Sequence, residues 1–200
     1  MRIGILGGGQ LGRMLALAAH ELGVQPVVFA QGPGPATEVA GTSVTAPWSD
    51  ATALRGFAAS VDVVTYELEQ LPLAAVAAVA AVRPVYPPPK ALEAMQDRLL
   101  ERELLGRVGL PHAAFVPFEG PADMPAIETK VGYPSVIKGR RGGYDGKAQW
   151  RLGSRADLMR LAADVSELPS ASGGWTGAAS TPRLRAERGG RDVRFYPGSR

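Results

Sequence analysis

The chain has no cysteine, only two histidines and only four lysines among its 200 residues. The absence of cysteine excludes a disulfide framework, a cysteine nucleophile, and a thiolate zinc or iron–sulfur site. Because His20 and His112 lie far apart in the sequence, a zinc site built on histidines is not expected either. The sequence therefore predicts no metal site of these kinds.

Long apolar runs are also missing. The longest largely apolar stretch, residues 71–82, is rich in alanine, contains Pro72, and is too short to cross a bilayer. The apolar start that follows Arg2 ends at the glycines 7–9, so we expect no signal peptide and a cytoplasmic location. A hydrophobic content of 46% with 20% charged residues is typical of a globular protein.

The excess of positive charge is confined to one end of the chain. A net charge of +3 and a pI near 9.4 could indicate a nucleic-acid partner. Residues 1–165, however, contain 16 basic and 16 acidic residues, and the excess comes from the six arginines in 166–200. The sequence therefore predicts small-molecule substrates, with no nucleic acid and no membrane as partners.

Strands alternate with helices in the first part of the chain. We expect strands at 2–6, 25–30, 42–46 and 61–66, and helices at 10–22, 50–59 and 72–82. The first helix has an apolar face made of Leu11, Met14, Leu15, Ala18 and Leu22. This alternation predicts an α/β domain, a doubly wound and mainly parallel sheet with helices on both faces.

A proline-rich break at 84–89 suggests a linker, and residues 84–95 mark the expected domain boundary. Beyond it we expect a helix at 96–108, a strand at 112–117, a helix at 122–131, strands at 135–138 and 147–152, and a helix at 154–165. Between 169 and 192 the only large apolar residues are Trp175 and Leu184, so no core strand or helix is expected there. The predicted divisions are 1–90, 91–165 and an atypical tail at 166–200.

A glycine-rich turn, Gly7-Gly-Gly-Gln-Leu-Gly12, lies between the first strand and the first helix. Such a turn lets the backbone approach a ligand, and the helix amides attract an anion such as phosphate. Dinucleotide binding also needs an acidic residue at the end of the second strand, where this chain has Ala30 and Gln31. A phosphate-bearing small molecule is favoured, and a turn required only for packing is the alternative.

The segment 138–150, KGRRGGYDGKAQW, holds two of the four lysines around three closely spaced glycines. Its backbone amides could surround a polyphosphate while Lys138 and Lys147 offset the negative charge. It is not a Walker A loop, because Ala148 stands where Ser or Thr would bind magnesium. The alternative is an ordinary glycine-rich hairpin with solvated charges.

Glu67, Glu69 and Arg98 are the remaining candidates for ligand-binding residues. Glu67 and Glu69 follow a parallel strand at its carboxyl end, where such sheets bind ligands, and share a face if the strand continues. A solvated strand end is the alternative. Arg98, next to Asp97 at a helix start, could bind phosphate, but the sequence alone favours a surface residue paired with Glu101.

Four segments taken together resemble one family. GILGGGQLGRMLALAA at 4–19, DVVTYELEQLP at 62–72, QDRLLER at 96–102 and KGRRGGYDGKAQW at 138–150 are similar to N5-carboxyaminoimidazole ribonucleotide synthase, an ATP-grasp ligase of purine biosynthesis. Their order and spacing match over about residues 1–165, and GGYDGK-x-Q is the specific part. The resemblance implies a pre-ATP-grasp domain followed by the beginning of an ATP-grasp domain.

The family uses ATP and Mg²⁺ to join bicarbonate to the amine of 5-aminoimidazole ribonucleotide, through carboxyphosphate. The resemblance implies a homodimer, with Mg²⁺ ligands in a C-terminal part that is not recognisable here, so we expect little activity from this chain. No catalytic residue and no metal ligand is assigned. ATP contacts are implied for Arg98, Lys138, Gly143, Tyr144, Asp145, Gly146, Lys147, Ala148 and Gln149, and ribonucleotide contacts for Gly8, Gly9, Gln10, Leu11, Glu67 and Glu69.

The chain departs from the family at Gly139, where Thr or Arg is usual, and at Ala148, where Gly is usual. The composition of 166–200 suggests a frame-shifted reading or a truncated remnant. Two other functions stay open. One is another ATP-grasp ligase, such as a formate-dependent glycinamide ribonucleotide transformylase, and the other is a non-catalytic nucleotide-binding fragment.

Overall fold

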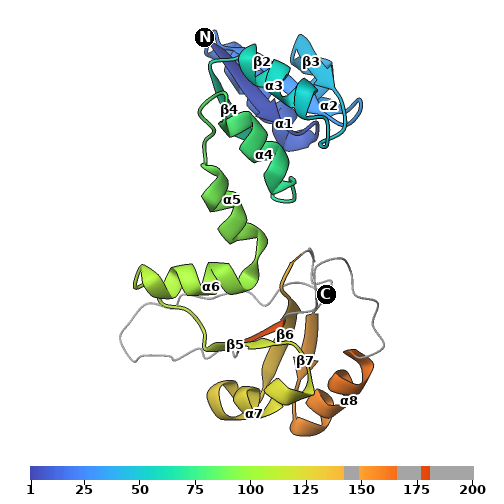
Figure 1. Cartoon of the computed structure of the whole chain (residues 1–200), viewed down its shortest axis with the longest axis vertical. Helices are drawn as coiled ribbons and strands as arrows, with labels where there is room; N and C mark the ends of the chain where they lie inside the picture. The colour runs from blue at the N-terminus through green and yellow to red at the C-terminus, as the bar shows by residue number, and fades with distance from the viewer. Residues whose placement is uncertain (142–148, 166–176, 181–200) are drawn as a thin grey trace.

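Two lobes connected by a helix make up the molecule (Figure 1). The computed structural model describes residues 1–141, 149–165 and 177–180. The N-terminal lobe contains β1–β4 and α1–α4, and the C-terminal lobe contains β5–β8, α7 and α8. Helix α5 leaves the first lobe, and α6 lies between α5 and the second sheet (Figure 1). No described helix is long and apolar enough to cross a membrane.

The N-terminal lobe has the doubly wound α/β fold that the sequence predicts. Its four strands are parallel, in the order β3-β2-β1-β4. Side chains alternate between the two faces, so Ile5 packs with α1 and α2 while Leu6 packs with α3 and α4. The elements are β1 (Arg2–Leu6), α1 (Gln10–Glu21), β2 (Gln25–Ala30), α2 (Pro35–Val39), β3 (Thr42–Thr45), α3 (Ala51–Ala59), β4 (Val63–Tyr66) and α4 (Leu73–Ala80).

The expected apolar face of α1 does not pack against the sheet. Leu11, Met14, Leu15, Ala18 and Leu22 are all exposed, whereas Gly12, Ala16 and Ala19 are buried. The helix lies too close to the turn before it for large side chains, since a Cβ at Gly12 would meet the Gly7 carbonyl oxygen at 2.8 Å. Close approach therefore selects the small-residue face, and the expectation of a buried leucine face is wrong.

The segment expected to be a linker is partly built into the N-terminal lobe. Val85 forms a parallel bridge with Val64, and both Val85 and Leu92 are buried in the core beneath α3 and α4. Residues 89–96 form a helix, α5 (Pro89–Gln96), and a separate helix, α6 (Arg98–Arg107), follows after Asp97. Val85, within the proline-rich break, and Leu92, on α5, therefore belong to the first core, and the domain boundary at 84–95 stays a prediction.

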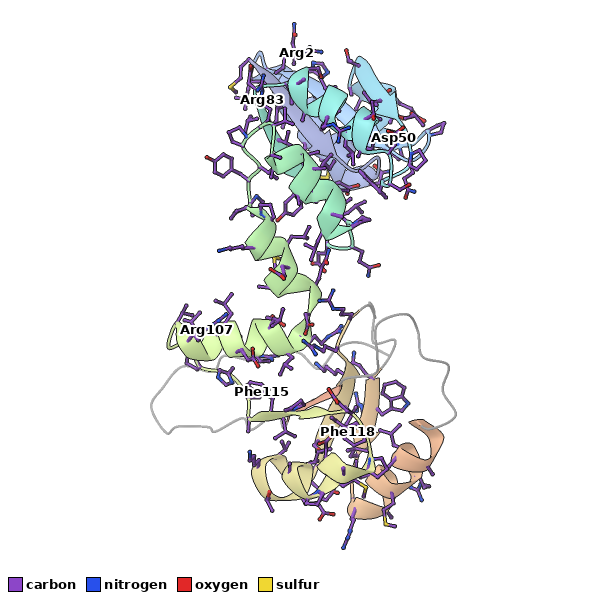
Figure 2. The ribbon with its side chains drawn as sticks, viewed as in Figure 1. Arg2, Asp50, Arg83, Arg107, Phe115 and Phe118 are labelled. Atoms are coloured by element: carbon purple, nitrogen blue, oxygen red, sulfur yellow. The ribbon has the colours of Figure 1, made fainter. Side chains whose placement is uncertain are left out.

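The C-terminal lobe has a second core and an antiparallel sheet in the order β5-β8-β6-β7. Phe118, labelled in Figure 2, is 2% exposed and packs in that core. The elements are β5 (Phe115–Phe118), η1 (Pro121–Asp123), α7 (Met124–Ala126), η2 (Ile127–Val131), β6 (Ser135–Gly139), β7 (Gln149–Leu152), α8 (Arg155–Val165) and β8 (Gly177–Ser180).

Strand β8 corrects the expectation that no core strand forms between 169 and 192. Its four residues pair antiparallel with β5 on one side and with β6 on the other. A central strand can be held by backbone hydrogen bonds on both edges and needs no large apolar side chain to be placed there. The composition of the segment was therefore a poor guide to its role in the sheet.

Candidate functional site

The glycine-rich turn is held by a carboxylate from a neighbouring strand. Because β1 and β4 are parallel neighbours, with Leu6 opposite Tyr66, the residues that follow them lie at the same edge of the sheet. There the backbone amide of Gly9, the N-cap of α1, donates a 2.9 Å hydrogen bond to Glu67 Oε1. Glu67 therefore supplies the negative charge that the N-terminus of a helix favours.

Packing within the protein requires several glycines of the turn. Gly7 has φ +126°, which side-chain-bearing residues rarely adopt, and a Cβ there would lie 2.4 Å from Glu67 Cγ. A Cβ at Gly8 would lie 2.9 Å from the Cβ of Ala30, and one at Gly34 would lie 2.6 Å from the Gly8 carbonyl oxygen. These contacts account for the glycines without a ligand.

The two acidic candidates do not behave alike. Strand β4 ends at Tyr66, so the condition for Glu67 and Glu69 to share a strand face is not met. Glu67 is half-buried and turned to Gly9, whereas Glu69 is exposed in a turn and its carbonyl oxygen accepts a hydrogen bond from Gln96. Gln10 and Leu11, at the start of α1, are exposed at the same edge. A ligand at this edge would meet a carboxylate that accepts hydrogen bonds, so amino or hydroxyl groups fit it best.

A second group of charged side chains lies where α6 meets the end of β6. Asp97 is fully buried between α5 and α6 and caps α6, accepting hydrogen bonds from the amides of Leu99 at 3.0 Å and Leu100 at 3.4 Å. It also binds Arg140 Nε at 2.6 Å and Arg141 Nε at 3.3 Å. One carboxylate thus joins the start of a helix to a strand more than forty residues away.

The pKa of Asp97 reflects two opposed effects. Burial alone would raise it, because the charged form loses its hydration. The hydrogen bond from Arg140 and those from the amides of Leu99 and Leu100 outweigh burial, and the pKa of Asp97 lies below its ordinary value. Asp97 is therefore a stable anion at neutral pH.

Arg98 and Lys138 are brought together as the resemblance implies. The Arg98 amide donates to the Arg140 carbonyl at 3.0 Å, and its guanidinium donates to the Gly139 carbonyl, so Arg98 is half-buried against β6. Ile137 packs in the core on one face of the sheet. Lys138, the next residue of β6, lies on the other face and is half-buried. The interpretation of Arg98 as an ordinary surface residue is therefore replaced by one in which it anchors α6 to β6.

The electrostatics of Lys138 indicate an excess of positive charge. Burial lowers the pKa of its ammonium group, the positive charges of Arg98 and Arg102 lower it further, and Glu101 opposes them. These three neighbours lie on one face of α6, at positions i, i+3 and i+4. A half-buried group of cations that destabilise one another is stabilised by a bound anion.

Gln149 is the other ATP candidate that the structure describes. It is exposed, begins β7 and lies opposite Lys138 across the hairpin. The strands predicted at 135–138 and 147–152 are observed as β6 and β7. The candidates Gly143, Tyr144, Asp145, Gly146, Lys147 and Ala148 lie outside the described residues.

Sequence reasoning missed the roles of Asp97, Arg140, Arg141 and Arg102. The available signal was Asp97, an aspartate at a helix start that is followed by Arg98 and Arg102. In the part of the chain that the structure describes, no three His, Asp or Glu side chains group as metal ligands would. No Mg²⁺ ligand is therefore assigned among the described residues, and no step through Mg²⁺ is derived from them.

Comparisons with known proteins give the same picture. Residues 1–96 match the ribonucleotide synthetase preATP-grasp domain, and residues 103–171 match the ATP-grasp domain. The N5-carboxyaminoimidazole ribonucleotide synthase of Pseudomonas aeruginosa is 37% identical over 200 residues, which include 98% of this chain and 55% of that protein. That alignment extends into residues 166–200, and the frame-shifted or truncated origin of these residues stays a hypothesis.

Solved structures agree in fold. The N5-carboxyaminoimidazole synthetase of Staphylococcus aureus complexed with ADP superposes with a TM-score of 0.79 at 30% identity, over 90% of this chain and 46% of that one. The Aspergillus clavatus synthase in complex with ADP and 5-aminoimidazole ribonucleotide gives 0.74 at 27%, over 90% and 46%. The chain spans about half the length of these relatives. It belongs to the family of N5-carboxyaminoimidazole ribonucleotide synthases and corresponds to the N-terminal half of its members.

Proposed function

We propose that this chain forms the N-terminal half of an ATP-dependent ligase that carboxylates 5-aminoimidazole ribonucleotide with bicarbonate. In that reaction the terminal phosphoryl group of ATP passes to bicarbonate, giving ADP and carboxyphosphate. The amine then takes up the carboxyl group, or the carbon dioxide released from carboxyphosphate, and inorganic phosphate leaves. The names of the relatives support this assignment, and so does the Aspergillus complex with ADP and the ribonucleotide.

The observation that carries the proposal is the group of cations at Lys138. Burial lowers the pKa of Lys138, the charges of Arg98 and Arg102 lower it further, and a polyphosphate placed between these side chains would offset the repulsion among them. We propose that Arg98, Lys138 and Gln149, together with segment 143–148, contact ATP. The ammonium and guanidinium groups would hold the phosphates and offset the charge that builds up during phosphoryl transfer.

The second part of the proposal places 5-aminoimidazole ribonucleotide at the edge formed by the turn at 8–11 and Glu67, with Glu69 beside it. Glu67 accepts a hydrogen bond from Gly9 and can accept another from an amino or hydroxyl group of the ligand. The helix N-terminus already holds this carboxylate, so we place the amino or ribose end of the ligand, rather than its phosphate, next to Glu67.

Titration calorimetry of the full 200-residue chain tests both parts. We expect ATP and 5-aminoimidazole ribonucleotide each to bind, Lys138→Met to weaken ATP alone, and Glu67→Gln to weaken the ribonucleotide alone. Lys130→Met is the matched control, because Lys130 is an exposed lysine of the same lobe. Binding of the ribonucleotide without ATP would instead support a non-catalytic nucleotide-binding fragment.

Turnover distinguishes the ligases. We expect the 200-residue chain to show little ADP formation, since its described residues offer no magnesium-ligand cluster and its relatives are about twice as long. Any ADP formation should require bicarbonate and 5-aminoimidazole ribonucleotide. Dependence on formate and glycinamide ribonucleotide would identify the other ligase. Sedimentation velocity tests the homodimer that the resemblance implies.

A further inference from the structure

Asp97 is buried more deeply than helix capping requires. Asp50 performs the same capping role at α3, accepting hydrogen bonds from the amides of Thr52 at 3.0 Å and Ala53 at 2.9 Å, and it is exposed. Figure 2 shows Asp50 in the N-terminal lobe, far from α6. Asp97 makes the same two kinds of bond but is 0% exposed. Capping alone therefore does not explain its burial.

The burial of Asp97 is balanced by arginines from the other side of the site. A buried carboxylate is strongly unfavourable unless it is paired and hydrogen-bonded. Arg140 and Arg141 provide the charge, at 2.6 and 3.3 Å, and the Arg98 amide donates to the carbonyl oxygen of Arg140 at 3.0 Å. The first turn of α6 and the end of β6 are therefore joined around this one side chain.

The first turn of α6 and the end of β6, which Asp97 joins, contain the residues proposed to contact phosphate. Arg98 is the next residue after Asp97, and Lys138 precedes Arg140 by two residues on β6. The positive charges of Arg98 and Arg102 act on Lys138, so these cations do not approach one another by mutual attraction. The Asp97 carboxylate provides the opposite charge that holds α6 against the end of β6 despite this repulsion, beside the hydrogen bonds that Arg98 donates to the carbonyl oxygens of Gly139 and Arg140.

We propose that Asp97 is a positioning residue for ATP, which fixes Arg98 on α6 and Lys138 on β6 at the spacing that one polyphosphate needs. This inference rests on the proposed binding of ATP. The sign of the effect separates positioning from simple charge. The carboxylate itself repels phosphates, so its removal would strengthen ATP binding if charge alone mattered. Removal weakens ATP binding if the carboxylate sets the geometry.

The test compares Asp97→Asn with Asp50→Asn in the full chain, by calorimetric titration with ATP and with adenosine, which has no phosphates. We expect Asp97→Asn to weaken ATP binding about 10- to 100-fold, the range seen for residues that orient the ligands of bound metals. Adenosine binding should not change, because the base and ribose do not contact these cations. Asp50→Asn should leave both affinities unchanged, because asparagine caps a helix about as well as aspartate does and Asp50 lies far from α6.

Asp97→Ser provides a second variant, because serine also caps helices and so keeps α6 intact while removing the charge. It should weaken ATP binding in the same way, with circular dichroism confirming the fold. Tighter or unchanged ATP binding in a folded variant would overturn the inference while leaving the proposed function in place. An equal loss for ATP and adenosine would also overturn it, as a general distortion. A wild-type chain that binds no ATP would refute the proposed function, and the inference with it.

Discussion

The substitution Gly7→Ala tests how strongly the glycine turn depends on Glu67. Gly7 is buried and has φ +126°, so alanine there costs about 1–3 kcal/mol in backbone strain. The new Cβ would also lie 2.4 Å from Glu67 Cγ and 2.6 Å from Oε1. Glu67 must then move, and the loss of its hydrogen bond to the Gly9 amide costs about 2 kcal/mol more. We expect a total loss of about 4 kcal/mol.

Two controls separate the contributions. Gly23 also has a positive φ, +69°, but a Cβ there meets nothing within 4 Å, so Gly23→Ala should cost only about 1 kcal/mol. Glu67→Ala alone should cost about 2 kcal/mol. The double variant Gly7→Ala/Glu67→Ala should lose about 4 kcal/mol, about 2 kcal/mol less than the sum of the single losses, because the hydrogen bond between Gly9 and Glu67 is lost in both single variants but only once in the double variant.

The assay is urea unfolding followed by the fluorescence of Trp48, which packs on Phe29 in the N-terminal core with ring centroids 5.1 Å apart. Replacing Trp150 and Trp175 by phenylalanine makes this the only tryptophan signal. If Gly7→Ala cost no more than Gly23→Ala, or if the double variant lost the full sum, the reasoning about Glu67 would be refuted.

Three further predictions concern charge and exposure. Lys138→Met should raise the Tm of the free chain, because it removes a cation that its neighbours repel, and should abolish the Tm increase caused by ATP; Lys130→Met should do neither. Because the folded pKa of Asp97 is lowered, its stabilisation is complete above the ordinary aspartate pKa of about 4 and is lost as the pH falls through the folded pKa, so the stability gap between wild type and Asp97→Asn should close as the pH is lowered below about 4. A gap that stayed constant would contradict this. Leu22 is 80% exposed, so Leu22→Lys should change the free energy of unfolding in urea by no more than about 0.5 kcal/mol. Leu54 is 1% exposed, so Leu54→Ala should lower that free energy by about 2–5 kcal/mol.

The fold of the first lobe could be predicted from the sequence because it depends on local signals. Turn residues, helix caps and the alternation of strand and helix patterns act within a few residues of one another, so the doubly wound fold and the β6–β7 hairpin could be predicted. The side of α1 that packs could not. Its leucines and its small residues Gly12, Ala16 and Ala19 both recur at helical spacing, and only the nearby turn selects between them.

The missed parts of the site depend on contacts between distant residues. Glu67 reaches Gly9 across 58 positions, and Asp97 reaches Arg140 across 43. The periodicity of apolar residues within one segment cannot predict a contact between two residues so far apart in the sequence. The resemblance directed attention to Arg98 and Lys138, but it was the burial of Asp97 that revealed what holds their two elements together.

The central place of β8 has a consequence for how the chain folds as it leaves the ribosome. The four strands of the first sheet are complete by Tyr66 and the core beside them by Leu92, so that lobe can fold while synthesis continues. The second sheet must wait for Gly177–Ser180, because β8 separates β5 from β6. Until then β5 and β6 each present an unpaired edge, the surface on which strands of other chains add. Fragments cut before residue 177 should therefore aggregate through this lobe.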